Sequence, residues 1–203
     1  ALAAQKYVPE LRSKGADIVV ALLHGGLDAS EYRADMENPG LYLSKVAGID
    51  AMVMGHQHSV FPDTADKPAF SMAGVDNKAG TINGVPAVMA SSWGKALGVV
   101  ALSLRWDGKA WSVDKAKSKS ELRNTATGKD AAGKATYVAV DGSIAPVVEG
   151  QHQAAIHYVK TPVGQTDFRM GTQFADVGDP GAIQIVNQAQ QDYVQRYVAA
   201  NLP

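Results

Sequence analysis

Three histidines stand directly after apolar segments, and they are the side chains of this sequence best suited to bind metal ions. His24 follows the apolar run at 18–23, whereas His56 and His58 follow the run at 50–54. A neutral imidazole is the commonest metal ligand in proteins. The end of a strand can hold such a ligand rigidly while the loop beyond it leaves space for an ion. The pattern therefore predicts a metal site built from His24, His56 and His58.

The spacing of the second pair supports one shared site. His56 and His58 are separated by a single residue, and Gly55 precedes them. In an extended stretch, side chains at positions i and i+2 point the same way, so both imidazoles are expected to face one metal cluster. Gly55 lets the backbone turn sharply beside the ions. An apolar strand followed by Gly-His-x-His, with an earlier strand followed by His-Gly, favours metal binding over hydrogen-bonded structural histidines.

Other chemistries find less support. His152 and His157 fall in a predicted helix at a spacing that places them on different faces, and we interpret them as surface side chains. Gly25-Gly26 is not a phosphate-binding loop, because no Lys follows it in the pattern that such loops need. The sequence has no cysteine, which excludes disulfides, thiolate metal sites and a cysteine nucleophile.

The elements that carry the histidines alternate between helices and strands. Apolar periodicity predicts a helix over 1–14 and a short helix after Pro39-Gly40. The runs at 18–23 and 50–54 predict strands, and we expect the first to be buried on both faces. Helix, strand and histidine loop thus occur twice. This order is typical of α/β architecture, in which ligands gather at the carboxyl ends of strands.

The pattern changes to antiparallel pairing after the second histidine loop. Residues 62–84 are rich in Gly, Pro, Asp and Asn and predict a long irregular loop. Asp107-Gly108 predicts a hairpin turn between two of the following strands. The predicted strands of this part occupy 85–89, 97–104 and 110–113.

A stretch of small and polar residues divides the chain. The predicted organisation is a first domain over 1–118, a linker over 119–142 and the start of a second domain over 143–203. Apolar spacing predicts an amphipathic helix over 143–160. Asp179 and Pro180 predict the N-cap and first residue of a final helix.

Bulk composition limits the partners. The 203 residues carry a formal net charge of −1, so we expect neither a nucleic-acid polymer nor an anionic membrane as partner. No apolar run approaches the roughly 18–20 residues of a membrane span.

The histidine blocks resemble those of the calcineurin-like metallophosphoesterases, and more particularly their nucleotidase branch. The Gly-His-x-His block is the mark of that superfamily. The residues after it and the C-terminal helix are similar to bacterial periplasmic enzymes that hydrolyse 2′,3′-cyclic nucleotides and 3′-nucleotides. The stretches that carry the resemblance are 15–26, 37–38, 48–62, 83–89, 93–100 and 183–190.

This resemblance implies the C-terminal part of a metallophosphoesterase αββα sandwich, followed by the start of a second α+β nucleotidase domain. It implies two divalent metal ions of the Mn, Zn, Co or Mg class, with His24 and His56 on one ion and His58 on the other. It also implies a nucleotide substrate, a periplasmic location and the remainder of a parent polypeptide as partner. The histidine that assists the leaving group is expected ahead of Ala1, so no catalytic residue is assigned here.

Two other functions remain open at this point. A 5′-nucleotidase would share the metal site and differ mainly in the pocket that selects the substrate. A non-catalytic scaffold or nucleotide-binding fragment is the other alternative, because the family's Asp-x-His, Gly-Asp and Gly-Asn-His blocks would precede Ala1. For the same reason we expect the isolated chain to be inactive and to bind metal weakly.

Several further residues have two readings each. Trp93 either flanks the active site or covers a sheet edge, and we favour the second interpretation. Glu37-Asn38 either hydrogen-bonds beside the metals or forms the turn before the next helix. Phe168, Phe174 and Tyr193 either stack on a base or pack in a core, and we favour the core.

Overall fold

The computed structural model describes residues 1–202, which form two compact units. The first unit runs from Ala1 to Val140 and the second begins at Asp141. The helices and strands of the first unit are α1 (Leu2–Ser13), β1 (Val20–Leu23), α2 (Gly40–Leu43), β2 (Ala51–Met54), β3 (Val60–Phe61), β4 (Val75–Asp76), β5 (Thr81–Ile82), β6 (Val85–Ala90), β7 (Ala96–Trp106), β8 (Trp111–Asn124), β9 (Ala126–Lys129) and β10 (Ala135–Tyr137).

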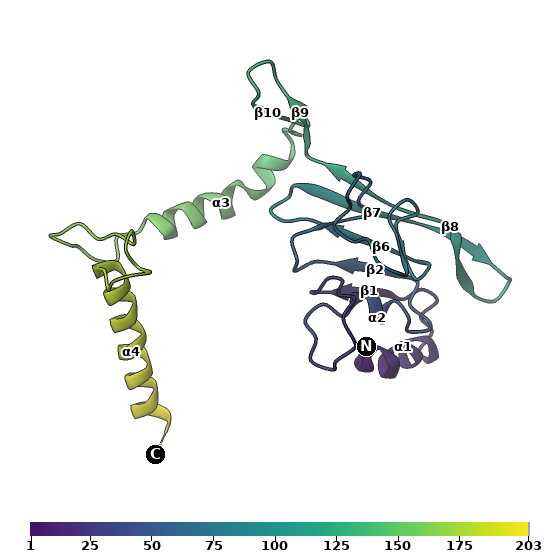
Figure 1. The fold of residues 1–203 in the computed structure, drawn as a ribbon, viewed down its shortest axis with the longest axis horizontal. Coiled ribbons are helices and arrows are strands. Elements are labelled where there is room, and N and C mark those ends of the chain that lie inside the picture. The colour runs from purple at the N-terminus through teal and green to yellow at the C-terminus, as the bar shows by residue number, and fades with distance from the viewer. Residues whose placement is uncertain (203) are drawn as a thin grey trace. The chain divides into compact units, whose positions relative to one another are not determined.

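The first unit is built on a mixed sheet in the strand order β1-β2-β6-β5-β4, with β3 also paired to β6 (Figure 1). Strands β1, β2 and β6 run parallel, so that Val20 lies beside Ala51 and Met52 beside Ala87. Strands β3 and β5 pair antiparallel with β6. The α/β order predicted from the sequence is therefore present, and the carboxyl ends of three parallel strands meet at one edge.

The core lies between the sheet, α1 and the segments that follow β1 and β2. Helix α1 buries Val8. The Val8 side chain packs closely against the backbone of Gly48, since a Cβ on Gly48 would come within 2.7 Å of it. The helix ends at Ser13, and Gly15, just beyond the C-cap Lys14, has a φ of 95° that suits a residue without a Cβ. The largest fully buried side chains are Phe61, Ile49, Met52, Ile82, Met89 and Pro86.

Strand β1 differs from the prediction that it is buried on both faces. Val20 is 45% exposed and Leu22 is 80% exposed, and Val53 of the neighbouring strand is 41% exposed. Strand β1 is at the edge of the sheet, and its alternate side chains point to opposite faces. Only the face that carries Val19 contributes to the core cluster. The continuous apolar run in the sequence thus did not show whether the strand is buried on both faces or on one face only.

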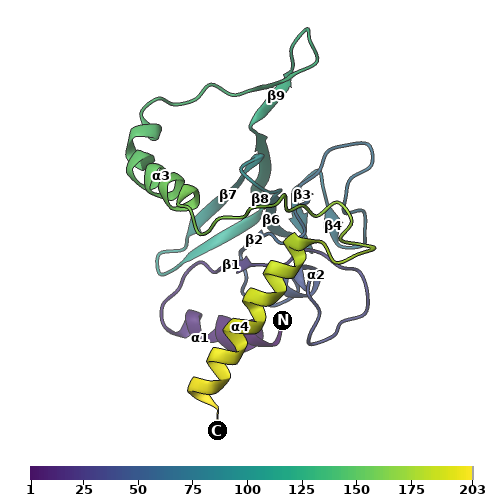
Figure 2. The same cartoon turned by 90° about the vertical axis from the view of Figure 1, so that its left-hand side faces the viewer.

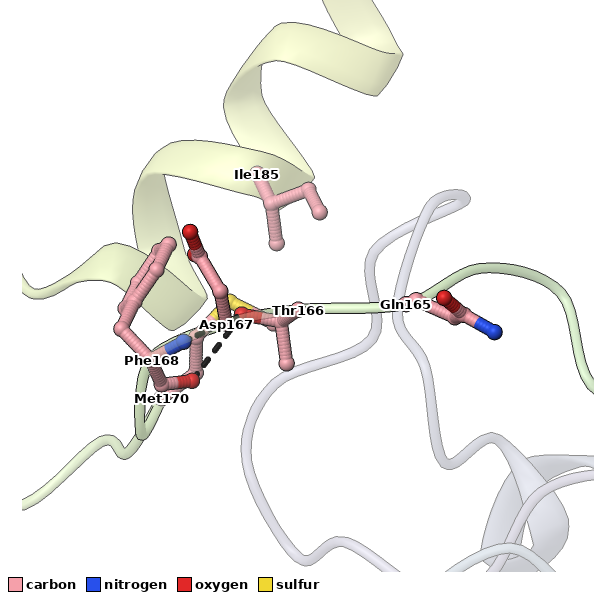
Figure 3. A pocket seen from close by; sticks show the side chains of 6 residues that line it. All are labelled: Gln165, Thr166, Asp167, Phe168, Met170 and Ile185. Carbon is pink, nitrogen blue, oxygen red and sulfur yellow. Dashed lines mark hydrogen bonds between the residues drawn. The ribbon is translucent and has the colours of Figure 1, made fainter.

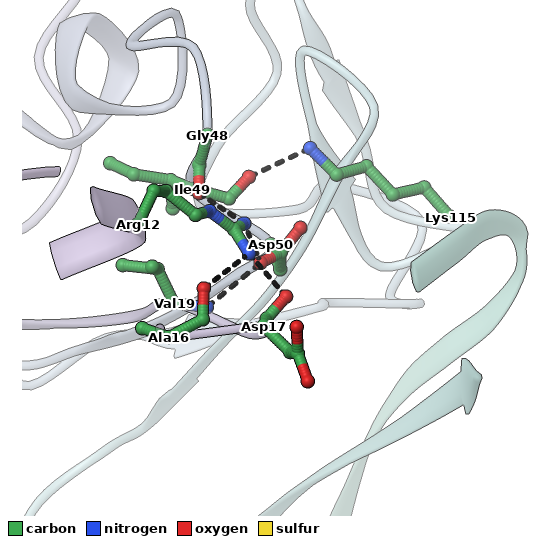
Figure 4. A network of polar contacts seen from close by, with 8 residues as sticks. All are labelled: Arg12, Ala16, Asp17, Val19, Gly48, Ile49, Asp50 and Lys115. Atoms are coloured by element: carbon green, nitrogen blue, oxygen red, sulfur yellow. Dashed lines mark hydrogen bonds and ion pairs between the residues drawn. The ribbon is translucent and has the colours of Figure 1, made fainter. Parts of the chain in front are cut away.

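A polar network joins the amino ends of β1 and β2 (Figure 4). The Arg12 guanidinium donates to the Asp50 carboxylate at 2.5 Å and to the carbonyls of Ala16, Asp17 and Gly48. Asp50 also accepts the Val19 amide at 2.8 Å. The network ties α1 to both strands, and its carboxylate is largely buried.

The β7–β8 hairpin follows the mixed sheet and turns where Asp107-Gly108 predicted it. The Asp107 carboxylate accepts the backbone amides of Ala110 and Lys109, which lowers the pKa of Asp107 below its ordinary value. Strand β8 extends to Asn124.

The segment expected as a linker over 119–142 contains the end of β8 and the small β9–β10 ladder, and the compact units divide after Val140. The side chains of β9 and β10 are mostly exposed. Strands of this kind do not need alternate apolar residues, so the sequence lacks the alternation that marks a half-buried strand.

The second unit contains the helices α3 (Ile144–Lys160) and α4 (Gly181–Asn201) (Figure 2). Helix α3 matches the predicted helix closely. Helix α4 starts one residue later than predicted: Pro180 occupies the N-cap, and Asp179 instead accepts from the Gln184 side chain. Neither helix buries a residue fully. Across residues 1–202, no helix combines the length and the apolarity that crossing a bilayer requires.

Candidate metal centre

Three loops with chemically distinctive side chains leave the same edge of the sheet. The loop after β1 begins at His24, the loop after β2 carries His56 and His58, and the loop after β6 carries Trp93. Since β1, β2 and β6 run parallel, all three loops start at their shared carboxyl edge.

His24 and His56 lie in direct contact. The Nε2 atom of His24 is 3.2 Å from the Nδ1 atom of His56, and the ring centroids are 5.1 Å apart. The other ring nitrogen of His56, Nε2, lies 2.5 Å from Glu37 Oε1. A carboxylate only accepts hydrogen bonds, so His56 Nε2 carries the proton. In neutral His56, Nδ1 then keeps its lone pair and points it toward His24.

Backbone contacts lock the two histidine loops together. The Gln57 side chain accepts the Leu27 amide at 2.8 Å and donates to the Leu27 carbonyl at 3.2 Å. Gly55 N–H donates to the Gly25 carbonyl at 3.3 Å. A Cβ on Gly26 would stand 1.7 Å from the Gln57 amide oxygen, so the Gln57 side chain would have to move away from its bonds to Leu27. These contacts set the distance between His24 and His56 through the backbone.

The segment between β2 and β3 is not extended, contrary to the geometry assumed from the one-residue spacing. His56 has a φ of 70° and His58 a φ of 55°, both in the left-handed region. The rule that side chains at i and i+2 of an extended stretch share a face therefore does not apply to this pair. His58 instead packs against Trp93, with ring centroids 5.7 Å apart and a tilt of 53°.

The three predicted ligands thus divide into a pair and a single residue. His24 and His56 touch each other, whereas His58 contacts the loop after β6. Among residues 1–202, no group of three or more His, Asp or Glu side chains is placed to hold one ion together. A division in which His24 and His56 serve one ion and His58 another is compatible with this arrangement.

The donor geometry of the pair suits a divalent ion. Two nitrogen ligands about 2.0–2.1 Å from one ion, at an angle of about 90–110°, are separated by about 2.8–3.4 Å. The observed separation of 3.2 Å between His24 Nε2 and His56 Nδ1 falls in this range. Glu37 on the far nitrogen of His56 matches the carboxylate–histidine arrangement that orients metal ligands. His24 and His56 are therefore compatible with two of the ligands of one metal ion.

Glu37 and Asn38 each hydrogen-bond to one of the two histidine-bearing loops, and neither side chain caps the following helix α2. Glu37 contacts His56, while the Asn38 carbonyl oxygen accepts the Gly26 amide at 2.8 Å. The sequence pattern indicated this dipeptide as a candidate, but it did not predict that Glu37 contacts His56. No spacing rule could have done so, because 19 residues separate them.

Asp28 is a further carboxylate in the loop after β1. Hydrogen bonds from the Ser30 backbone amide and the Ser30 hydroxyl lower the pKa of Asp28. The carboxylate is therefore held ionised in a local turn and adds negative charge to this loop.

The remaining candidate residues lie in the second unit and are exposed. His152 and His157 are exposed on α3, as expected. Phe168, Phe174 and Tyr193 are 59%, 72% and 69% exposed, so the interpretation of these three as core residues is wrong.

The second unit also holds a cavity of about 390 Å³ (Figure 3). Thr166, Asp167 and Phe168 line it from the loop before α4, and Ile185 lines it from the helix. None of its lining residues is a histidine, so it offers no imidazole ligand for a metal ion.

Comparison with known proteins shows clear relatives, although no family model matches the chain. The chain is 42% identical over 197 residues to the 2′,3′-cyclic-nucleotide 2′-phosphodiesterase/3′-nucleotidase of Salmonella typhimurium. It is 35% identical over 194 residues to the trifunctional nucleotide phosphoesterase protein YfkN of Bacillus subtilis. These matches cover 96% and 95% of the chain, but only 29% and 12% of the two relatives.

A solved structure agrees with these sequence matches. The crystal structure of the calcineurin-like phosphoesterase YfkN from Bacillus subtilis superposes with a TM-score of 0.64 at 33% identity. The match covers 79% of this chain and 44% of that chain. The chain is therefore similar in sequence and in fold to a part of these phosphoesterases.

Proposed function

This chain belongs to the calcineurin-like phosphoesterases, and from that premise we propose that its protein is a two-metal hydrolase of nucleotide phosphoesters. The observation that carries the proposal is the pairing of His24 Nε2 with His56 Nδ1 at 3.2 Å, with Glu37 on the far side of His56. Because the chain spans 29% of the Salmonella relative, the activity is proposed for the whole protein.

Each residue has a defined task in this proposal. His24 and His56 would hold one ion, and His58 would hold the second. Glu37 keeps the proton on His56 Nε2, so that the Nδ1 lone pair stays available as a ligand. The bound ions would supply a water acidic enough to attack phosphorus at neutral pH, together with positive charge for the phosphoryl oxygens. Gln57 holds the two loops at the spacing that this ligand set needs.

The substrates we propose are 2′,3′-cyclic nucleotides and 3′-nucleotides. The relatives from Salmonella typhimurium, Yersinia enterocolitica and Haemophilus influenzae, at 38–42% identity, are all named for these two activities. That agreement favours them over 5′-nucleotides. We also propose a periplasmic location, which rests on the resemblance to periplasmic enzymes. Cell fractionation with marker enzymes tests the location.

Hydrolysis by the natural full-length protein tests the proposal. With Mn²⁺ present, 2′,3′-cyclic AMP and 3′-AMP should release product faster than 5′-AMP, and EDTA should stop all three reactions. A preference for 5′-AMP would identify a 5′-nucleotidase instead. Nucleotide binding without turnover would identify a non-catalytic protein.

The 203-residue chain by itself is expected to bind Mn²⁺ weakly and to turn over slowly. Two-metal sites need more ligands than three histidines, including carboxylates. A turnover rate on bis-p-nitrophenyl phosphate equal to that of the full-length protein would show that the chain carries the complete ligand set.

A further inference from the structure

The side-chain amide of Gln57 clamps one residue of the loop after β1. Its oxygen accepts the Leu27 amide at 2.8 Å, and its nitrogen donates to the Leu27 carbonyl at 3.2 Å. An amide group that bonds both backbone groups of one residue holds that residue as a paired strand would. Leu27 is 2% exposed and belongs to the hydrophobic core of the first unit. The clamp therefore ties Gln57, the residue after His56, to a fixed point of the fold.

His56 itself is the central residue of a tight turn. The Gln57 N–H donates to the Gly55 carbonyl at 2.9 Å, and His56 between them has a φ of 70°. Three-residue turns whose central residue has a positive φ are rare and strained. Such a conformation persists where the surrounding structure imposes it. The clamp on Leu27 imposes it here, because it fixes the residue at which the turn ends.

The Gln57 side chain can reach Leu27 because residue 26 is a glycine. A Cβ on Gly26 would lie 1.7 Å from the Gln57 amide oxygen, 2.4 Å from Cδ and 2.8 Å from Cγ. These three nearest atoms all belong to the one flexible side chain, and the φ of Gly26 lies outside the left-handed region. An alanine at residue 26 would therefore displace Gln57 from its bonds without straining the backbone.

We propose that Gly26 and Gln57 act as one positioning unit for the metal ligand His56. The missing side chain of Gly26 admits the Gln57 amide, and the amide holds the strained turn in place before an ion arrives. Binding of the ion then does not have to order the loop, which is the advantage of a preorganised site. Glu37 holds the ring of His56, whereas the clamp holds the backbone that carries this ring. The inference rests on the proposed function, to which it adds how the first ion site is preorganised.

Mn²⁺ affinities of the natural full-length protein, measured by calorimetry without nucleotide, test the inference. Gln57→Ala and Gly26→Ala should each weaken the binding of one ion by about 10- to 100-fold, as substitutions of the partners of metal ligands do. Gln57→Ala also removes the three atoms that a Cβ at residue 26 would meet. The double variant should therefore lose no more than about threefold beyond Gln57→Ala, whereas independent effects would multiply to about 100- to 10,000-fold.

Helix α3 offers a matched control for each substitution. A Cβ on Gly150 would meet no atom within 4 Å, and the Gln153 side chain bonds Glu149 on the same exposed helix. Gly150→Ala and Gln153→Ala should leave the Mn²⁺ affinity unchanged.

NMR of the metal-free protein gives a second readout, which depends neither on an ion nor on turnover. The rings of His24 and His56 have centroids 5.1 Å apart, so their ring protons should show a nuclear Overhauser effect in EDTA. This signal should weaken in Gln57→Ala and in Gly26→Ala, while urea unfolding keeps a single cooperative transition. A substitution that only loosened the fold would shift the unfolding midpoint and leave the contact between the two rings in the folded protein.

Two results would overturn the inference. One is an unchanged Mn²⁺ affinity in Gln57→Ala, and the other is a multiplied loss in the double variant, which would mean that Gly26 and Gln57 act separately. The proposed function can fail independently. If the parent protein does not hydrolyse 3′-AMP but the variants lose the contact between His24 and His56, the positioning unit stands without the hydrolase. If the parent hydrolyses 3′-AMP and both variants keep the contact and the affinity, the hydrolase stands without the positioning unit.

Discussion

The two ends of the parallel strands β1 and β2 differ in how their polar side chains are arranged. At the amino ends, Arg12 and Asp50 bond to each other and to neighbouring backbone groups, and 11% of the Asp50 side chain is exposed. At the carboxyl ends, the side chains of His56 and Glu37 are 35% and 71% exposed. His56 also has a left-handed backbone.

We infer from this difference that the same pair of strands serves stability at one end and, in the proposed function, metal binding at the other. Removing one partner of the largely buried Arg12–Asp50 pair leaves the other without its partner, which destabilises the fold. An exposed imidazole pair in a loop contributes little to folding. Substitutions at the two ends should therefore separate stability from activity.

The largest effect is expected at the histidine end. His56→Ala and His58→Ala should each lower kcat in the full-length protein by more than about 100-fold, since losing a partner of a metal ligand already costs 10–100-fold. The free energy of unfolding should change by about 0.5 kcal/mol or less, as for other exposed substitutions. Kinetics at saturating Mn²⁺ together with urea unfolding measure both quantities.

The matched control for these variants is His152→Ala on α3, which should alter neither quantity. Near-normal kcat in His58→Ala at saturating Mn²⁺ would remove His58 from the metal site.

The opposite pattern is expected at the amino end. Asp50→Ala should lower the free energy of unfolding by about 3 kcal/mol, because it leaves the Arg12 charge and the Val19 amide without their partner. Activity per folded molecule should not change. Asp35→Ala is the control, because Asp35 lies 3.8 Å from Arg33 in a highly exposed pair that should contribute little. Equal destabilisation by the two variants would mean that the Arg12–Asp50 pair does not stabilise the strand ends.

A smaller effect is expected for the residue that orients His56. Glu37→Gln should lower the Mn²⁺ affinity of the full-length protein by about 10–100-fold, because a neutral amide holds the proton on His56 Nε2 less firmly. Folding should be unaffected, since the Glu37 side chain is mostly exposed. Calorimetric titration with Mn²⁺ measures the change. An unaltered affinity would mean that Glu37 does not support the metal site.

The smallest effect concerns the pH dependence of the loop after β1. Hydrogen bonds from Ser30 lower the pKa of Asp28 in the folded protein. Its contribution to stability is therefore fully present above the pKa of an aspartate in the unfolded chain, and it is lost as the pH falls through the lowered folded-state pKa. An NMR titration of the Asp28 carboxyl should show a midpoint below that of an unstructured aspartate. Ser30→Ala should raise this midpoint, although the backbone amide of residue 30 still donates.

The alternation of helix, apolar strand and histidine loop was sufficient to predict the α/β fold and the meeting of His24 with His56. Local periodicity determines which segments become strands, and parallel pairing then brings the carboxyl ends to one edge. The hairpin at Asp107 was equally predictable, because the turn depends on residues next to each other in the chain. These features depend on short-range patterns that a sequence displays directly.

The direction of each side chain was decided by contacts between distant residues. His56 and His58 have a left-handed φ and contact different partners, His24 and Trp93, and the one-residue spacing gave no sign of either feature. Glu37 reaches His56 because the segment before α2 is bonded to the loop after β1, through Asn38 and Gly26.

The sequence by itself thus predicted the candidate metal ligands and the edge of the sheet to which they belong. Tertiary structure alone decided that Glu37 bonds to His56, that His58 faces Trp93, and that β1 leaves Leu22 exposed. The physical reason is that hydrophobic periodicity is a property of neighbouring residues. Loop dihedral angles and burial, in contrast, depend on which distant backbone groups are available as hydrogen-bond partners and on which elements cover each face.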